Sequence, residues 1–267
     1  MKKAYLGVLS LAAAAMVAAT FVTNAYAEDF GKYAVGDRRS GYTFMTKETK
    51  AIQDDDFENP AIIWVEEGEA LWSKEEGKKG FACKECHGDV SSMKGAATKF
   101  PKYDKKLKKL KNLEQQINIC RKDFMQAKPW KYESNELLQM TMLVKYQSRD
   151  MPMNVSIDDE AAPFFAAGKK FYYQRRGALD MACKHCHEDN PGKMARANLL
   201  TQGQINGFPT YRLKWQKPGS VHRRFRGCNK NIRATPLKYG ADEYNNLELY
   251  VAWRGRGLPV ETPSVRN

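Results

Sequence analysis

Histidine, long apolar runs and acidic charge are all in short supply in this chain of 267 residues. Only four histidines are present, and His87 is the only one before residue 185, so a site in the first half cannot combine several imidazoles. After residue 22 no stretch is long and apolar enough to span a bilayer, which excludes later membrane helices. Few segments carry strand signals, which disfavours an all-β fold.

The first 27 residues are predicted to be a cleaved export signal. Lys2 and Lys3 form a positive start, residues 6–22 are largely apolar, and Ala-Tyr-Ala at positions 25–27 is a small-x-small cleavage pattern. An uncleaved anchor is the alternative, because the apolar stretch approaches spanning length. With cleavage before Glu28 we expect a soluble periplasmic protein without a stable membrane anchor.

Basic residues outnumber acidic ones by 44 to 31, which gives a net charge of +13. Removal of Lys2 and Lys3 with the signal lowers this value to +11. A basic surface can attract nucleic acid, membranes or acidic proteins. Export argues against nucleic acid and leaves anionic substrates or an acidic protein partner.

The motif Cys-x-x-Cys-His occurs twice. The motif residues are Cys83, Cys86 and His87 in the first copy and Cys183, Cys186 and His187 in the second. In c-type cytochromes the two thiols of this motif hold haem covalently and the adjoining imidazole binds the iron. A zinc ribbon places its second cysteine pair about 15 to 20 residues after the first, whereas these pairs begin 100 residues apart. The sequence therefore predicts two covalently bound c-type haems.

Each motif is followed by one further cysteine, Cys120 and Cys228, and we favour these as the opposite axial ligands of the two irons. They occupy corresponding places, eleven and ten residues before a Lys-Tyr pair. Methionine is the usual alternative in electron carriers, and the two cysteines could also form a disulfide in an oxidising compartment. The other possible ligands are Met93, Met125, Met140 and Met142 in the first half, and Met194 and His222 in the second.

An internal repeat surrounds the two motifs. Residues 131–152 correspond without a gap to residues 238–259, and both stretches begin with Lys-Tyr and end at a proline. Apolar residues recur in both at a spacing near 3.6, which predicts one core-facing helix in each. These residues are Leu137, Met140, Leu143, Val144 and Met151, and then Tyr244, Leu247, Tyr250 and Val251.

The organisation that follows is mainly α, with two tandem cytochrome c-like domains that each carry one haem. About 240 mature residues are enough for two separate cores. We expect an N-terminal extension over residues 28–60, a first haem domain over 61–155, and a second, catalytic haem domain over 156–267.

Basic residues gather at two places in the chain. Arg223, Arg224, Arg226 and Lys230 surround Cys228, and a guanidinium fork there could bind the oxygens of a small anion. A solvated basic loop is the alternative. The run over residues 102–111 is a candidate docking patch for an acidic carrier protein, although such runs usually only solvate a helix face.

These features resemble the SoxA family, the diheme cytochrome subunits of the bacterial thiosulfate-oxidising Sox system. The resemblance covers most of the mature chain and is most specific over residues 224–229, Arg-Phe-Arg-Gly-Cys-Asn. It implies that Cys120 and Cys228 are the distal ligands of the first and second iron, opposite His87 and His187. It also implies that Cys228 carries a persulfide and that the arginine four residues before it binds substrate.

For function, the resemblance implies an L-cysteine S-thiosulfotransferase. Thiosulfate would be joined oxidatively to a cysteine of the carrier complex SoxYZ, with two electrons leaving through haem. The cytochrome SoxX would be the partner in a heterodimer and would accept the electrons. Two other functions stay open: a plain diheme electron carrier, and a thiosulfate dehydrogenase that forms tetrathionate.

Overall fold

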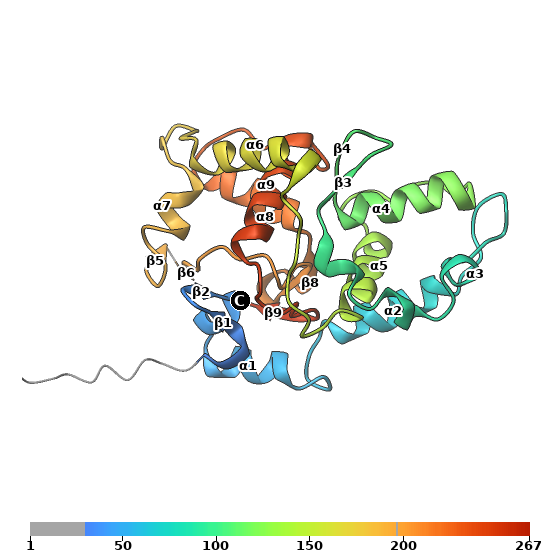
Figure 1. Ribbon diagram of the computed structural model, residues 1–267. Coiled ribbons are helices and arrows are strands. Elements are labelled where there is room, and N and C mark those ends of the chain that lie inside the picture. Colours follow the sequence, from blue (N-terminus) through green and yellow to red (C-terminus); the bar gives the residue numbers. More distant parts are fainter. Residues whose placement is uncertain (1–29, 196) are drawn as a thin grey trace, which may run out of the picture.

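The computed structural model describes residues 30–195 and 197–267, so the predicted export signal lies outside the described residues. Within them the protein is mainly helical, as expected, and the strands are short (Figure 1). The helices are α1 Lys47–Asp54, α2 Ile62–Trp72, α3 Cys83–His87, α4 Leu113–Ile119, α5 Asn135–Tyr146, α6 Ala162–Tyr173, α7 Cys183–His187, α8 Val221–Asn231 and α9 Asp242–Arg254. None of these described helices has the length and apolar character needed to cross a membrane.

The described strands form three antiparallel pairs and one three-stranded sheet. The strands are β1 Ala34–Val35, β2 Arg38–Arg39, β3 Lys102–Asp104, β4 Lys109–Lys111, β5 Met194–Ala195, β6 Asn198–Leu199, β7 Thr210–Arg212, β8 Lys217–Gly219 and β9 Ser264–Arg266. In the sheet, β7 lies between β8, which is antiparallel to it, and β9, which is parallel. The sheet joins the chain's C-terminal strand to the hairpin that precedes α8.

Each half is built around one pair of packed helices, α2 with α5 and α6 with α9 (Figure 1). The apolar residues predicted to face the core within α5 and α9 are buried, including Leu137 and Leu143 on α5 and Tyr244 and Leu247 on α9, whereas Met151 lies beyond α5 and is only half-buried. Both helices begin later than their Lys-Tyr pairs. The Ser134 hydroxyl accepts the N–H of Leu137 and so fixes the start of α5.

A glycine stands at the closest approach of each helix pair. A Cβ atom on Gly168 would lie 1.9 Å from the Asn246 carbonyl oxygen, and one on Gly68 would lie 2.7 Å from that of Gln139. Both neighbours are backbone atoms, which cannot turn aside as a side chain can. Only glycine therefore allows these helices to pack so closely.

Gly168→Ala is expected to lower the free energy of unfolding by about 3 kcal/mol, because the added methyl overpacks a backbone contact. Gly68→Ala should cost less, since its nearest contact is longer. The control is Gly227→Ala on α8, where no atom lies within 4 Å of the new Cβ and alanine improves helix propensity. Melting curves of the three variants check the order; equal stability of the Gly168 and Gly227 variants would contradict it.

The repeat extends to the segment between each motif and its distal cysteine. In both halves a Phe-Pro pair precedes an antiparallel hairpin, β3–β4 or β7–β8, and a capping side chain then starts the helix that leads to the cysteine. Counterparts are 108 positions apart. The matched pairs are Phe100 with Phe208, Pro101 with Pro209, Asp104 with Arg212, Lys111 with Gly219, Asn112 with Ser220, Gln116 with Arg224, and Cys120 with Cys228.

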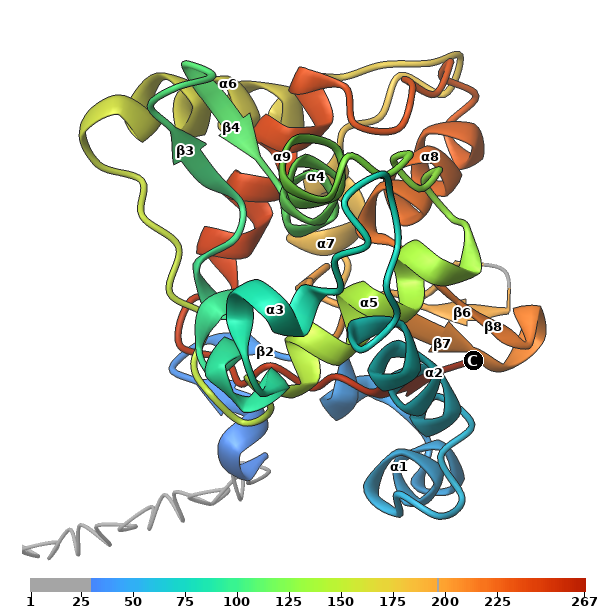
Figure 2. The same cartoon turned by 90° about the vertical axis from the view of Figure 1, so that its right-hand side faces the viewer.

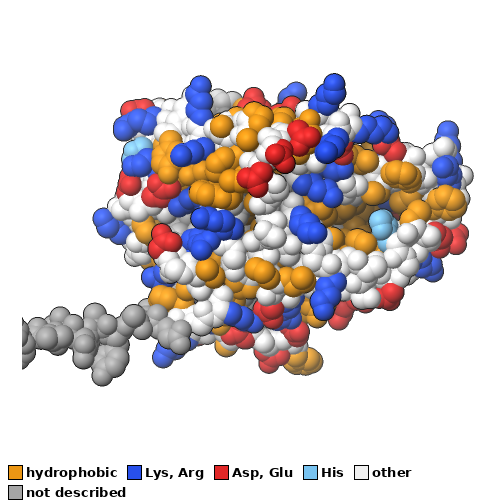
Figure 3. Space-filling view, in the orientation of Figure 1, with side chains coloured by type: hydrophobic (Ala, Val, Ile, Leu, Met, Phe, Trp, Pro, Cys, Tyr) orange, Lys and Arg blue, Asp and Glu red, His pale blue; other side chains and the backbone are white. Residues whose placement is uncertain are grey.

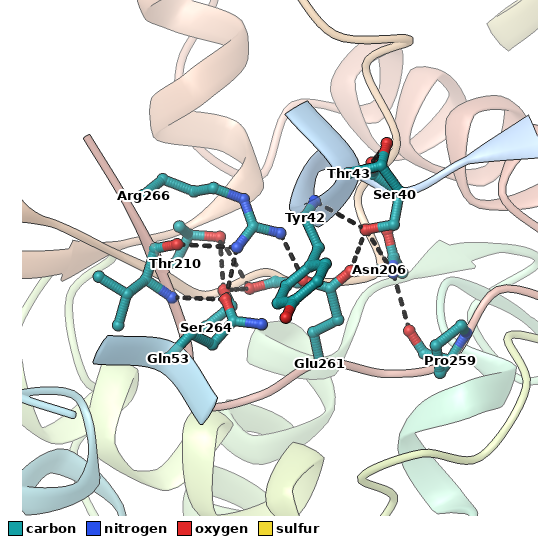
Figure 4. Close-up of polar contacts among 12 residues, drawn as sticks. Ser40, Tyr42, Thr43, Gln53, Asn206, Thr210, Pro259, Glu261, Ser264 and Arg266 are labelled. Atoms are coloured by element: carbon teal, nitrogen blue, oxygen red, sulfur yellow. Dashed lines mark hydrogen bonds and ion pairs between the residues drawn. The ribbon is translucent and has the colours of Figure 1, made fainter. Parts of the chain in front are cut away.

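The N-terminal residues are tied to the C-terminal tail by a buried polar network (Figure 4). The Glu261 carboxylate accepts hydrogen bonds from the Ser40 hydroxyl and from Asn206 Nδ2, the latter at 2.9 Å, and it also pairs with Arg266. Gln53 Oε1 accepts the Val265 N–H at 3.0 Å. Helix α1 consequently lies against β9 (Figures 1 and 2).

Ionisable side chains are buried where the two halves meet. His222 on α8 is fully buried, with Nε2 3.0 Å from the Glu248 carboxylate on α9, and Glu114 on α4 and Lys145 on α5 lie nearby. Burial, followed by the charge of Glu248, raises the pKa of Glu114 to about 7. Burial also lowers the pKa of Lys145. The interface thus holds charge at an energetic cost that depends on pH.

Candidate active site

The two motifs form matching short helices. In α3 the Glu85 carboxylate accepts the Ala82 N–H, and in α7 His185 Nδ1 accepts the Ala182 N–H at 2.9 Å. His185 therefore caps its own helix. Each helix presents two cysteines and a histidine over five residues.

The second motif holds its histidine ready for a metal. His187 Nδ1 lies 2.8 Å from the Thr201 carbonyl oxygen, and donation there leaves Nε2 as the free nitrogen. Burial lowers the pKa of His187, which favours the neutral ring. Gly203 lies against this ring, because a Cβ atom there would be 2.8 Å from the imidazole Cγ.

The first motif is more open. His87 and Cys86 are exposed, and the Trp72 ring lies 5.7 Å from the imidazole. The Trp72 indole N–H donates to the Gly88 carbonyl at 3.0 Å and so fixes the loop after the motif. On the face drawn in Figure 3, hydrophobic side chains line a hollow at the right.

Each distal cysteine lies near its own motif. Burial raises the pKa of Cys83 to about 11, with Arg121 opposing this shift and the nearby Cys120 adding to it. Burial, followed by the neighbouring Cys228, likewise raises the pKa of Cys183 to about 11. All six cysteines are free, so the alternative of a disulfide between Cys120 and Cys228 finds no support.

Most of the rival iron ligands are directed elsewhere, but Met93 lies in the short turn directly after the first motif and is half-buried against the first core. His222 Nδ1 accepts the Gly240 N–H at 3.0 Å and its Nε2 faces Glu248, so both ring nitrogens are directed at protein groups. Met125, Met140 and Met142 are buried in the core of the first half, and Met194 is mostly exposed on β5.

Cys228 has two arginines beside it without acidic partners. Arg224 stands one turn earlier on α8, and no hydrogen bond or ion pair of its guanidinium occurs in the described part of the chain. Arg212 reaches the same site from β7. Burial, followed by the charges of Arg224 and Arg266, lowers the pKa of Arg212 to about 9, while the nearby Cys228 opposes this shift.

Of the other basic residues predicted at this site, two make contacts elsewhere and the third is exposed. Arg223 pairs with Glu133 at 3.4 Å, Arg226 donates to the Leu237 carbonyl, and Lys230 is exposed. Of the four residues in the predicted cluster, the structure leaves Arg224 as the anion-binding candidate. Arg212 was missed from the sequence because it lies 16 residues before Cys228 and its burial is not visible there.

The surroundings of Cys120 are different in charge. Gln116 occupies the position that Arg224 has in the second half, and its Nε2 donates to Cys120 Sγ at 3.2 Å. The neighbouring Arg121 is buried and neutralised, since it pairs with Glu76 at 2.6 Å and stacks on the Trp130 ring. Arg121 is thus compensated, and Lys102 on β3 is the cation that remains near Cys120: burial lowers the pKa of Lys102, and Cys120 is among the groups that oppose this shift.

The basic run over residues 102–111 forms the β3–β4 hairpin rather than a helix face. Three of its lysines have acidic neighbours: Lys105 lies 3.6 Å from Glu160, Lys109 lies 3.5 Å from Asp242, and Lys111 pairs with Asp104. On the face drawn in Figure 3, lysine and arginine are dispersed over the surface.

Haem fits the donor set of both halves. A pair of thiols on one helical turn and an adjoining imidazole are the groups that attach a c-type haem, and a nearby cysteine is one of the side chains that can also bind its iron. His187 meets this requirement most fully, because its Nδ1 is already engaged. An open cavity of about 590 Å³ also borders His187, lined in part by Tyr173, Tyr250 and Trp253.

The fold and these sites define a cytochrome c-type protein, whose cofactor is haem. The SoxA/TsdA cytochrome c domain matches residues 67–153 and 167–260. The chain is 46% identical over 230 residues to the L-cysteine S-thiosulfotransferase subunit SoxA of Rhodovulum sulfidophilum, covering 86% of this chain and 80% of that protein. With these matches, the chain belongs to the SoxA/TsdA cytochrome c family.

Two further relatives agree. The SoxA subunit of Paracoccus pantotrophus is 44% identical over 228 residues, which covers 85% of this chain and 79% of that protein. The crystal structure of SoxXA from P. pantotrophus superimposes with a TM-score of 0.83 at 44% identity and covers 86% of this chain and 87% of that chain.

Proposed function

We propose that this protein is the haem-binding subunit of an L-cysteine S-thiosulfotransferase, which joins thiosulfate oxidatively to a cysteine of a SoxYZ carrier. The names of its relatives support this activity. The observation that carries the proposal is Arg224 without an acidic partner among the described residues, one helical turn before Cys228. An anionic substrate can bind there beside a thiol.

We further propose two covalent haems, one held by Cys83 and Cys86 and the other by Cys183 and Cys186. The side chains that would bind the iron are His87 and Cys120 in the first half and His187 and Cys228 in the second. Support for this pairing comes from the position of each distal cysteine near its own motif. A bound haem supplies the acceptor for the electrons that the reaction releases.

In the chemistry we propose, Cys228 carries a persulfide and acts as a covalent relay. Its outer sulfur bonds to the terminal sulfur of thiosulfate, and two electrons leave as that S–S bond forms. The carrier thiolate, which has released its proton, then attacks the thiosulfate-derived sulfur. It takes the sulfane–sulfonate group, and the Cys228 persulfide is restored.

Arg224 would bind the sulfonate oxygens by charge-assisted hydrogen bonds and direct the terminal sulfur toward Cys228. The partner would be the cytochrome SoxX, which appears with SoxA in the matched SoxXA structure. Export to the periplasm would place the protein with its carrier and substrate. The first haem, beside a neutral Gln116, would serve electron transfer or structure.

Mass spectrometry of the Cys228 peptide tests the relay. We expect a mass increase of one sulfur atom in the isolated holoprotein and a thiosulfate adduct on the carrier cysteine after incubation with thiosulfate and the SoxX partner. Tetrathionate without a carrier adduct would instead indicate a thiosulfate dehydrogenase. If Cys228 is an unmodified thiol in every preparation and no sulfur product forms, the protein is a plain electron carrier.

A further inference from the structure

The hairpin before α8 differs in charge from its counterpart in the first half. Strand β7 ends at Arg212, whereas the matching strand β3 ends at Asp104. Asp104 is neutralised by Lys111, and the position of that lysine is taken in the second half by Gly219. The acid–base pair of the first hairpin is thus replaced in the second by Arg212, a cation without an acidic partner in the hairpin, where it stands opposite Lys217.

Gly219 creates room for an aromatic platform. A Cβ atom at this position would lie 2.8 Å from the Trp215 ring and 2.9 Å from Arg223 Cδ. With glycine there, the Trp215 ring meets three guanidinium groups. The distances from the guanidinium carbon to the ring centroid are 4.1 Å for Arg223, 5.4 Å for Arg212 and 5.9 Å for Arg224.

Two of these three guanidiniums lack a balancing carboxylate. Arg223 is paired with Glu133, but no ion pair or side-chain hydrogen bond of Arg212 or Arg224 occurs within residues 30–195 and 197–267. Arg212 Nε is shielded from solvent and has no hydrogen-bond acceptor. A buried donor without a partner is costly, and two uncompensated cations beside Cys228 call for an anion of charge −2.

We propose that Arg212 is the second anion-binding arm of the Cys228 site and holds the sulfonate oxygens of thiosulfate together with Arg224. This inference rests on the thiosulfate chemistry proposed above and adds a residue from a different element, β7, to the substrate site. Trp215 positions the two arms through cation–π contacts with both guanidiniums. Both positive charges also act on Lys214, next to Trp215. Burial, followed by the charges of Arg212 and Arg224, lowers the pKa of Lys214.

A carboxylate of the haem itself is the competing anion for Arg212. Both halves carry the same haem motif, so a residue needed for the cofactor should be cationic in both. The first half has Asp104 at this position and Gln116 in place of Arg224. Both arginines are thus present only in the half with the proposed sulfur chemistry. This pattern favours the substrate over the haem carboxylate as the anion that Arg212 binds.

The test is calorimetric titration of sodium thiosulfate into the holoprotein, with haem held reduced so that no oxidation can follow. Arg212→Gln is expected to raise the Kd of thiosulfate about 10- to 100-fold, the effect of losing one charge-assisted pair. Arg212→Lys should fall between this variant and wild type, because it keeps the charge and loses the planar fork. In the conjugation assay, KM should rise more than kcat falls.

The matched control is Arg223→Gln. Arg223 contacts the same Trp215 ring, but its charge is already neutralised by Glu133. Its Kd should stay within about threefold of wild type. An unchanged Kd for thiosulfate in Arg212→Gln overturns the inference. If the Kd is unchanged but the haem midpoint potential or the haem content shifts, Arg212 binds the haem carboxylate instead.

The two proposals fail in different ways. If wild type binds thiosulfate, and Arg212→Gln binds it weakly, while no adduct forms on the carrier, the conjugation chemistry is wrong and the anion arm stands. If the carrier adduct forms at wild-type KM in Arg212→Gln, the arm is wrong and the conjugation stands. Melting temperatures and haem spectra of each variant show that the fold is retained.

Discussion

Replacing Cys228 by alanine is expected to lower the rate of thiosulfate conjugation about 10³-fold or more, the size of effect seen when a covalent relay is removed. The variant loses both the sulfur that would carry the persulfide and the side chain facing the second haem motif. Arg224 remains one turn away, so thiosulfate should still bind. The loss should therefore appear in kcat rather than in KM.

Cys228→Met separates the two roles of this sulfur. Methionine can bind a haem iron but cannot form a persulfide. We expect a low-spin haem spectrum in this variant together with the same loss of conjugation as in the alanine variant. A Cys228→Met protein that conjugates thiosulfate at the wild-type rate would remove the relay and leave Cys228 as an axial ligand only.

Cys120→Ala is the comparison from the first half. Its neighbour Gln116 is neutral and Arg121 is paired with Glu76, so this thiol lacks the two arginines that lie beside Cys228. The change should alter the spectrum of the first haem and reduce conjugation far less than Cys228→Ala. Equal losses in the two variants would indicate that both halves take part in the sulfur chemistry.

Much of the fold could be predicted from periodicity and repetition. The apolar spacing in residues 131–152 and 238–259 identified the core faces of α5 and α9, because burying one stripe of a helix requires that spacing. The starts of these helices were not predicted. Tyr132 and Tyr239 belong instead to loops, where their rings stack on each other across the interface of the halves at 5.7 Å.

The basic run over residues 102–111 shows why charge alone misleads. Its composition suggested a solvated helix face or a docking patch, but the Asp104 carboxylate accepts the N–H groups of Lys106 and Leu107 and turns the chain into a hairpin. This hydrogen bonding depends on backbone conformation. It could not be inferred from the number of lysines.

The cysteines of the candidate site could be predicted from the sequence. Of its two arginines, only Arg224 could be. Proximity in sequence singled out Arg224, but it also suggested Arg223 and Arg226, which the fold directs to Glu133 and to a carbonyl. Arg212 comes from β7, and a sequence does not show which distant strand faces a helix. Comparing the two halves position by position would have found it, since Asp104 in one half stands against Arg212 in the other.

The second large effect concerns the buried charges between the halves. Glu114 faces Glu248 on α9, His222 on α8, Lys145 on α5 and the Tyr132 ring. Burial and the Glu248 charge raise its pKa from an ordinary value of 4.5 to about 7. The folded protein therefore holds the Glu114 proton more tightly than the unfolded chain does.

Glu114→Gln is expected to stabilise the protein increasingly as pH rises. Below pH 4.5 the carboxyl is protonated in both states, so the variant and wild type should unfold alike. Between pH 4.5 and 7 the unfolded chain releases this proton first, which favours unfolding of the wild type. Above pH 7 the difference is complete, at about 3 kcal/mol in favour of the variant.

Unfolding free energies of the two holoproteins at several pH values from 4.5 to 8 measure this difference. The matched control is Glu243→Gln, an exposed carboxylate on α9, which should show no such trend. A stability gap that is flat with pH, or that shrinks as pH rises, would mean that Lys145 neutralises Glu114 fully in the folded state. In that case the interface would hold a compensated ion pair. Removing Glu114 would then destabilise the protein, because the buried Lys145 ammonium would lose its partner charge.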